Sequence, residues 1–168
     1  MDQSLINLLM ALVALLISFY CFYLVNQLRK EPKTDKEHFN TKPLQLQAYE
    51  RLVMLAERIA IPNLISRVNQ PGLSAREMQL LLLESIKQEV EYNATQQIYV
   101  SPVAWEAVRN LKDQNMLIIN QVAATLAPEA SSIDLNKMLL DFVIKQKKGA
   151  LHSIVLEALN YEAKKIMR

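Results

Sequence analysis

The sequence predicts an all-α protein, with one N-terminal transmembrane helix followed by a small soluble helical bundle of about five helices. Three observations support this fold class: a long uncharged apolar run near the N-terminus, six prolines that all fall between segments of helical period, and no convincing strand-like alternation. We divide the 168 residues into a transmembrane anchor over 1–26, a juxtamembrane linker over 27–42 and a helical bundle over 43–168.

The first element is the apolar run over Leu5–Val25, in which only Asn7 and Ser18 are polar. As a helix rising 1.5 Å per residue, this run spans about 30 Å, the thickness of a bilayer's hydrocarbon core. A cleaved signal peptide fits less well, because Asp2 stands where an export signal carries Lys or Arg, and no small-residue cleavage site follows. We therefore expect a retained single-pass anchor in contact with the lipid bilayer.

The linker sets the expected orientation of the anchor. All basic residues near the anchor lie on its C-terminal side: Arg29, Lys30, Lys33 and Lys36. By the positive-inside rule, the N-terminus lies outside and the bundle lies at the cytoplasmic face of the cell's inner membrane. Acidic residues in the same segment nearly cancel these charges, so a dedicated lipid site is not predicted.

The bundle begins with two helices that have clear start signals. The first is expected over 43–60, where Pro43 occupies the first turn. The second is expected over 74–99, because Ser74 and Glu77 have the spacing of a capping box.

Three further helices complete the predicted bundle, over 102–126, 133–147 and 150–167. Ser101 and Pro102 provide an N-cap and a first-turn proline for the earliest of these, and Gly149 can end the next one. Short connections make consecutive helices antiparallel neighbours.

Residue scarcity excludes several classes of chemistry. Two glycines cannot build a phosphate-binding loop, and one cysteine with two histidines cannot provide four N or S ligands for structural zinc. Neither histidine follows a glutamate by three residues, as a di-iron bundle site requires. We therefore expect no catalytic residue, no metal and no cofactor, and rank an enzyme with a site assembled across the bundle last.

One set of polar residues continues the apolar stripes of two helices. Glu89, Asn93 and Gln97 extend the stripe of the 74–99 helix, and Asn115 interrupts the stripe of the 102–126 helix. These residues form a candidate polar seam, in which each would pair with another or with Arg51, Arg58 or Arg67, because unpaired buried polar groups are costly. The seam either fixes the helix register or binds a small polar ligand.

Two surface features are also candidates for partner binding. A candidate basic surface comprises Lys145, Lys147, Lys148, Lys164, Lys165 and Arg168. It is either a set of solvated helix ends or a contact for anionic lipid, RNA or an acidic protein, although no nucleic-acid motif or interleaved aromatic residue accompanies it. A candidate partner surface comprises apolar residues outside the main stripes, Ile133, Leu140, Ile144 and Leu156.

Three sequence segments carry a resemblance. LQAYERLV over 46–53, NLISRV over 63–68, and NATQQIYVS over 93–101, followed by Trp105, resemble a bacterial family of uncharacterised single-pass membrane proteins. The resemblance implies the same order of anchor, linker and all-helical domain. It implies no activity and no catalytic residue.

These observations favour a non-enzymatic, membrane-tethered interaction or accessory subunit. Its expected partner is another membrane-associated protein or a second copy of the chain, and nucleic acid is not expected. The alternative is a small-ligand sensor that uses the polar seam.

Overall fold

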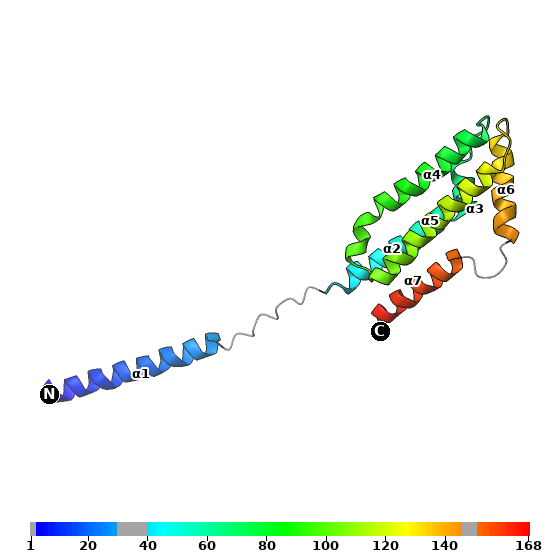
Figure 1. The fold of residues 1–168 in the computed structure, drawn as a ribbon. Coiled ribbons are helices and arrows are strands. Elements are labelled where there is room, and N and C mark those ends of the chain that lie inside the picture. Colours follow the sequence, from blue (N-terminus) through cyan, green and yellow to red (C-terminus); the bar gives the residue numbers. More distant parts are fainter. Residues whose placement is uncertain (1–2, 30–39, 146–150) are drawn as a thin grey trace. The chain divides into compact units, whose positions relative to one another are not determined.

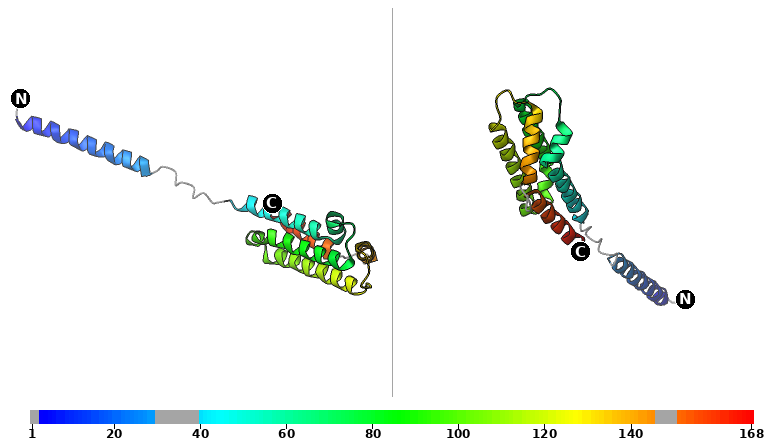
Figure 2. Two further views of the ribbon diagram at one scale, coloured as in Figure 1. Left: turned by 90° about the horizontal axis from the view of Figure 1, so that it is seen from above. Right: turned by 90° about the vertical axis from the view of Figure 1, so that its right-hand side faces the viewer.

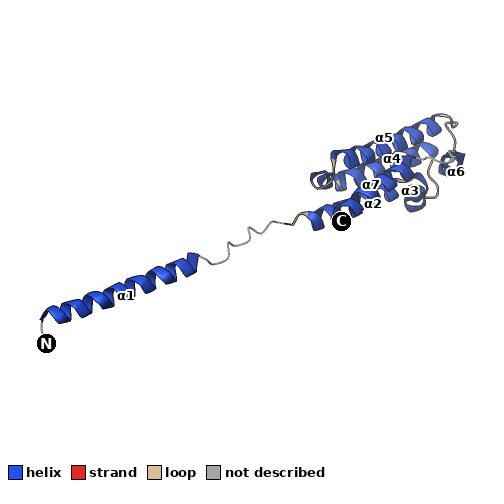
Figure 3. Ribbon diagram, turned by 90° about the horizontal axis from the view of Figure 1, so that it is seen from below, coloured by secondary structure: helices blue, strands red, loops and turns tan. Residues whose placement is uncertain are grey.

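The computed structural model describes residues 3–29, 40–145 and 151–168, and every regular element in these ranges is helical (Figure 3). The chain divides into two compact units, Met1–Asn40 and Thr41–Arg168.

The first unit contains the helix α1, Gln3–Arg29. Its window Met10–Gln27 is long and apolar enough to cross a membrane, and no part of that window is buried by protein. A helix of this kind suits a membrane span or a signal sequence. α1 continues past the predicted anchor boundary to Arg29, while Lys30, Lys33 and Lys36, as well as the side chain of Arg29, lie outside the described part of the chain.

The second unit is built on four long helices: α2 (Lys42–Ile59), α4 (Ala75–Tyr92), α5 (Pro102–Ala124) and α7 (Leu151–Met167). They alternate in direction along the bundle (Figure 1). α2 packs most extensively against α7, whereas α4 packs mainly against α5 and α6.

Three shorter elements complete the bundle: α3 (Ile61–Val68), the 3-10 helix η1 (Ala94–Ile98) and α6 (Ser132–Lys145). α6 lies across the end of the bundle, steeply inclined to the long helices (Figures 1 and 2). α3 packs against both α4 and α6 at this end.

The structure differs from the sequence prediction at two places. α3 was not predicted, because Pro62 is expected from the sequence to lie between helices. A proline in the first helical turn lacks only an N–H that has no partner there, so α3 begins at Ile61. The helix expected over 74–99 ends at Tyr92, and the tighter η1 follows it. The end of the helix predicted over 133–147 and the start of that over 150–167 lie at 146–150, outside the described residues.

The end of the bundle near α6 is closed by two loops that pair with each other. The Ala75 N–H donates to the Ala130 carbonyl at 2.9 Å, and the Ser132 N–H donates to the Leu73 carbonyl at 2.9 Å. The predicted capping box of Ser74 and Glu77 is present, and Gly72 adopts a positive φ of 85° in the turn before it.

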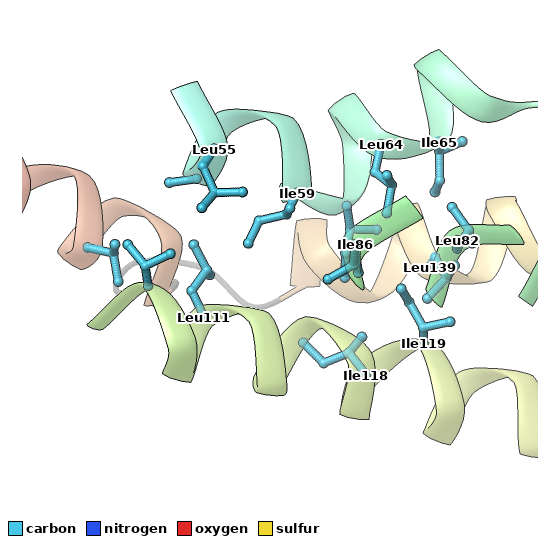
Figure 4. Close-up of a cluster of buried hydrophobic side chains, with 14 of the residues drawn as sticks. Leu55, Ile59, Leu64, Ile65, Leu82, Ile86, Leu111, Ile118, Ile119 and Leu139 are labelled. Atoms are coloured by element: carbon cyan, nitrogen blue, oxygen red, sulfur yellow. The ribbon is translucent and has the colours of Figure 1, made fainter. Parts of the chain in front are cut away.

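One continuous apolar core joins the six α-helices of the bundle (Figure 4). Leu55 and Ile59 of α2 face Leu111 of α5, while Leu82 of α4 lies beside Leu139 of α6. All five side chains are almost completely buried, which makes this core the main source of stability.

Candidate functional site

A groove lies between α2 and α4, and we call it the α2–α4 groove. Its volume is about 630 Å³. It is lined by Arg51, Met54, Leu55, Arg58, Gln88, Glu89, Tyr92 and Asn93. Two predicted seam residues, Glu89 and Asn93, therefore lie here.

A single carboxylate oxygen organises the polar side of the α2–α4 groove. Glu89 Oε1 accepts from Arg58 Nε at 2.9 Å and Nη2 at 2.6 Å, and from Arg67 Nη1 at 2.6 Å. Burial alone would raise the pKa of the Glu89 carboxyl, but the hydrogen bonds and charges of the two arginines outweigh burial and lower it. The expected pairing of Glu89 with arginine is thus present, and Glu89 stays ionised at neutral pH.

The same region satisfies the carbonyl groups at the end of α2. Arg67 Nη2 donates to the Arg58 carbonyl at 3.1 Å, Asn63 Nδ2 to the Glu57 carbonyl at 2.9 Å, and Asn115 Nδ2 to the Ile59 carbonyl at 2.8 Å. The last carbonyls of a helix have no partner within the helix. These side chains therefore stabilise the break between α2 and α3.

The predicted polar seam is not one continuous feature. Asn93 is buried and donates to the Glu89 carbonyl at 2.8 Å, so it caps α4 beside the groove. Gln97 is exposed and does not line the groove, so its predicted place in the seam is wrong. The reason is η1: a 3-10 helix turns 120° per residue rather than 100°, so the stripe of α4 cannot be extended past Tyr92. Asn115 is buried as expected, but it lies in a different place.

Asn115 lines a second hollow, the corner cavity, beside the break between α2 and α3. Its volume is about 330 Å³. The lining is Glu57, Ala60, Ile61, Pro62, Asn63, Leu111, Gln114, Asn115, Ile118, Val143, Leu151 and His152. The Nε2 atom of His152 is buried without a hydrogen bond, and Glu57 Oε2 lies 3.6 Å away. A mostly apolar wall with a few polar groups is typical of small-molecule sites.

A further polar cluster, which was not predicted, joins α2, α7 and the N-cap residue of α5. Tyr49 Oη donates to Glu162 Oε2, and accepts from the Ser101 N–H at 3.1 Å. Ser101 Oγ donates to the same Glu162 oxygen at 2.6 Å and accepts from the Ala104 N–H at 3.0 Å. Burial first, and the carboxylate of Glu162 second, raise the pKa of Tyr49.

One signal for this cluster was present in the sequence. Tyr49 and Ser101 belong to the segments 46–53 and 93–101, two of the three that carry the family resemblance. The third segment, 63–68, contains Arg67, which pairs with Glu89. The fold thus places residues of all three segments in the polar contacts of α2.

The predicted surfaces are only partly exposed. Ile133 and Ile144 are 71% and 70% exposed, whereas Leu140 and Leu156 are partly buried against the core, so the four do not form one exposed patch. This correction follows from helix packing, because Leu140 and Leu156 lie close enough to the main stripes of their helices to contact neighbours. Of the predicted basic surface, Lys145, Lys164, Lys165 and Arg168 are exposed, and Lys147 and Lys148 lie outside the described residues.

Within the described ranges, no group of three or more His, Cys, Asp or Glu side chains could hold a metal ion. Cys21 is free and exposed on α1.

Comparison with known proteins identifies the family of the chain but no relative of known activity. No curated protein and no solved structure matches the chain. One family model matches residues 3–166, which include α1 and nearly the whole bundle. The chain therefore belongs to the family of unknown function DUF7935.

Proposed function

We propose that the protein is a non-enzymatic, membrane-tethered interaction or accessory subunit that presents its helical bundle at the cytoplasmic face of the inner membrane. The observation that carries this proposal is the division of the chain into an apolar helix without protein cover and a separate compact bundle. An uncovered apolar helix is stable where lipid surrounds it, because a helix satisfies its own backbone hydrogen bonds.

The side chains around the α2–α4 groove support binding to a protein partner. Arginine, methionine and tyrosine are enriched at protein interfaces, and the groove contains Arg51, Met54 and Tyr92. The partner is another membrane-associated protein or a second copy of the chain.

The proposed orientation rests on charge. Arg29, Lys30, Lys33 and Lys36 follow the apolar run, and no basic residue precedes it. Cysteine labelling tests this orientation, because Cys21 is the single cysteine of the chain and Cys21→Ser provides a cysteine-free background. In spheroplasts, a membrane-impermeant maleimide should label Asp2→Cys and leave Ser153→Cys unlabelled until the membrane is opened. The reverse pattern would place the bundle outside and contradict the proposed location.

Purification of the full chain from gently solubilised membranes tests the interaction itself. We expect a stoichiometric partner, or a dimer of the chain, to elute with it at a defined mass by light scattering. Recovery of the chain only as a monomer, with no second component, would contradict the proposal.

A small-ligand sensor is the second candidate function, and the corner cavity is the observation that favours it. Its volume of about 330 Å³ and its mixed lining suit a small amphiphilic molecule. Native mass spectrometry of the purified chain should then show an added small mass that disappears in Val143→Phe, which fills the cavity. An unliganded mass for the unsubstituted chain, together with unchanged thermal stability in metabolite extracts, would exclude this function.

A further inference from the structure

We propose that the α2–α4 groove is the docking site for an acidic helix of the partner protein, one that carries an apolar stripe between its carboxylates. This inference rests on the proposed interaction function and names the surface and the partner's chemistry. It follows from the shape, the apolar rim and the charge of the groove.

The shape of the groove suits a helix. α2 packs more extensively against α7 than against any other helix, and α4 packs mainly against α5 and α6, so both walls of the groove are supported from behind. The buried Leu55 and Asn93 lie among its lining residues. An additional helix laid between two supported helices packs its ridges into their grooves, as amphipathic helices do when they bind helical domains.

The rim of the groove exposes large apolar surface. Met54 is 62% exposed and Tyr92 is 75% exposed, and they come from opposite walls, α2 and α4. A methionine adapts to the shape of a partner, and a tyrosine buries a large area at a small cost in side-chain entropy. An apolar stripe on the incoming helix would remove both side chains from water.

The charge of the groove selects an acidic partner. Arg58 and Arg67 share one oxygen of Glu89, so a single carboxylate is matched with two guanidinium groups. Arg51 lines the same groove and forms no hydrogen bond or ion pair within the described part of the chain. Arginine binds carboxylates through two parallel hydrogen bonds, so the surplus positive charge fits Asp or Glu side chains on the partner.

A second copy of this chain is a poorer occupant if it binds through its α7. The exposed end of that helix carries Lys164, Lys165 and Arg168, which would repel the groove. A lipid headgroup supplies negative charge, but it supplies no rigid apolar stripe for the rim formed by Met54 and Tyr92.

Photo-crosslinking in living cells tests the proposal with the full chain. Benzoylphenylalanine replaces Met54 in the groove or, as a matched control, Leu117, which is 54% exposed on α5 and does not line the groove. The cross-linked peptides are then sequenced by mass spectrometry. We expect adducts from position 54 and not from position 117, joined to a partner segment with apolar residues at helical spacing flanked by Asp or Glu.

Charge reversal provides the second arm of the test. Arg51→Glu should lower the yield of the position-54 adduct about tenfold, the effect of losing one well-placed charge pair. Arg109→Glu reverses an exposed charge on α5 outside the groove and should leave the yield unchanged. Thermal melts of both variants should match the unsubstituted chain, which separates loss of binding from loss of folding.

Several results would overturn the inference. They are an adduct to a second copy, to lipid or to a basic segment, equal adducts from positions 54 and 117, or no effect of Arg51→Glu. If a partner co-purifies with the Arg51→Glu variant in the same amount as with the unsubstituted chain, the groove is wrong and the interaction function stands. If no partner co-purifies with the unsubstituted chain, the interaction function itself fails.

Discussion

Two polar clusters, each centred on one glutamate, attach α2 to the rest of the bundle in different ways. Glu162 receives its hydrogen bonds from Tyr49 and Ser101, two neutral hydroxyl groups. Glu89 receives its hydrogen bonds from two cations, Arg58, which lines an open groove, and Arg67 of α3.

The difference distinguishes a structural role from the proposed binding role. In the Glu162 cluster, the carboxylate accepts hydrogen bonds from two partly buried neutral hydroxyl groups, so the contacts hold three helices together and provide no cation for an acidic partner. In the Glu89 cluster the cations outnumber the carboxylate, and Arg58 remains 46% exposed. A surplus charge that faces water contributes little to stability and is available for recognition.

The largest loss of stability is expected from Tyr49→Phe, which disrupts the Glu162 cluster. The substitution keeps the buried ring but removes the hydroxyl, so the Ser101 N–H loses its acceptor and Glu162 loses one donor. We expect the free energy of unfolding to fall by about 1–3 kcal/mol, measured by chemical denaturation of the bundle over 41–168.

Tyr92→Phe is the matched control, because Tyr92 is exposed on α4 and its change should stay within about 0.5 kcal/mol. Equal stability losses for the two tyrosines would contradict a structural role for the Glu162 cluster.

The pH dependence of stability provides a second measurement. Because the pKa of Tyr49 is raised in the folded chain, the unfolded chain releases this proton first as the pH rises. Stability should therefore decline as the pH rises above the ordinary tyrosine value of 10.0, and this contribution should be missing from Tyr49→Phe.

Asn115→Ala should have the next largest effect. The buried amide supports the last carbonyl of α2, and its removal leaves the Ile59 oxygen without this donor next to the corner cavity. We expect a loss of about 1–2 kcal/mol in the free energy of unfolding. The exposed Asn110 of α5 provides the control: alanine has the higher helix propensity, so Asn110→Ala should not destabilise the bundle, and a similar loss there would contradict a specific role for the Asn115 hydrogen bond.

A smaller effect is expected from Glu89→Gln, about 1 kcal/mol or less, because Arg58 and Arg67 can turn to water when the carboxylate is removed. The lowered pKa of Glu89 gives stability that is present above the ordinary value of 4.5 and is lost as the pH falls through the folded-state pKa. The decrease in the free energy of unfolding at low pH should therefore be smaller in Glu89→Gln than in the unsubstituted chain. Tyr49→Phe, in contrast, changes the pH dependence only at high pH. An unchanged acid profile would show that the ion pair does not form in solution.

The sequence predicted most of the fold, because its signals are local. The capping residue Ser74, the first-turn proline Pro102 and the apolar run of α1 each act through neighbouring residues, and each element starts where these signals place it, within about two residues. α3 was missed because a proline occurs both in the first turn of a helix and in loops, and the sequence around Pro62 does not distinguish the two.

The candidate site was predicted less well, because its contacts are distant in the chain. The pairing of Glu89 with arginines could be predicted from their opposite charges. No spacing rule links Tyr49, Ser101 and Glu162, which are separated by 52 and 61 residues. Projection on a helical wheel placed Glu89 and Asn93 correctly within or beside α4. It failed at Gln97, where the helix type changes.

The smallest effect is expected from Gln97→Leu, and it tests where the polar surface of α4 ends. If η1 points Gln97 into solvent, leucine removes no buried hydrogen bond and fills no cavity, so the free energy of unfolding should change by less than about 0.5 kcal/mol. The position-54 adduct should also persist, since Gln97 does not line the α2–α4 groove. A stabilisation above about 1 kcal/mol would instead mean that residue 97 packs against α2, and that the polar seam continues through η1 as a plain helical projection requires.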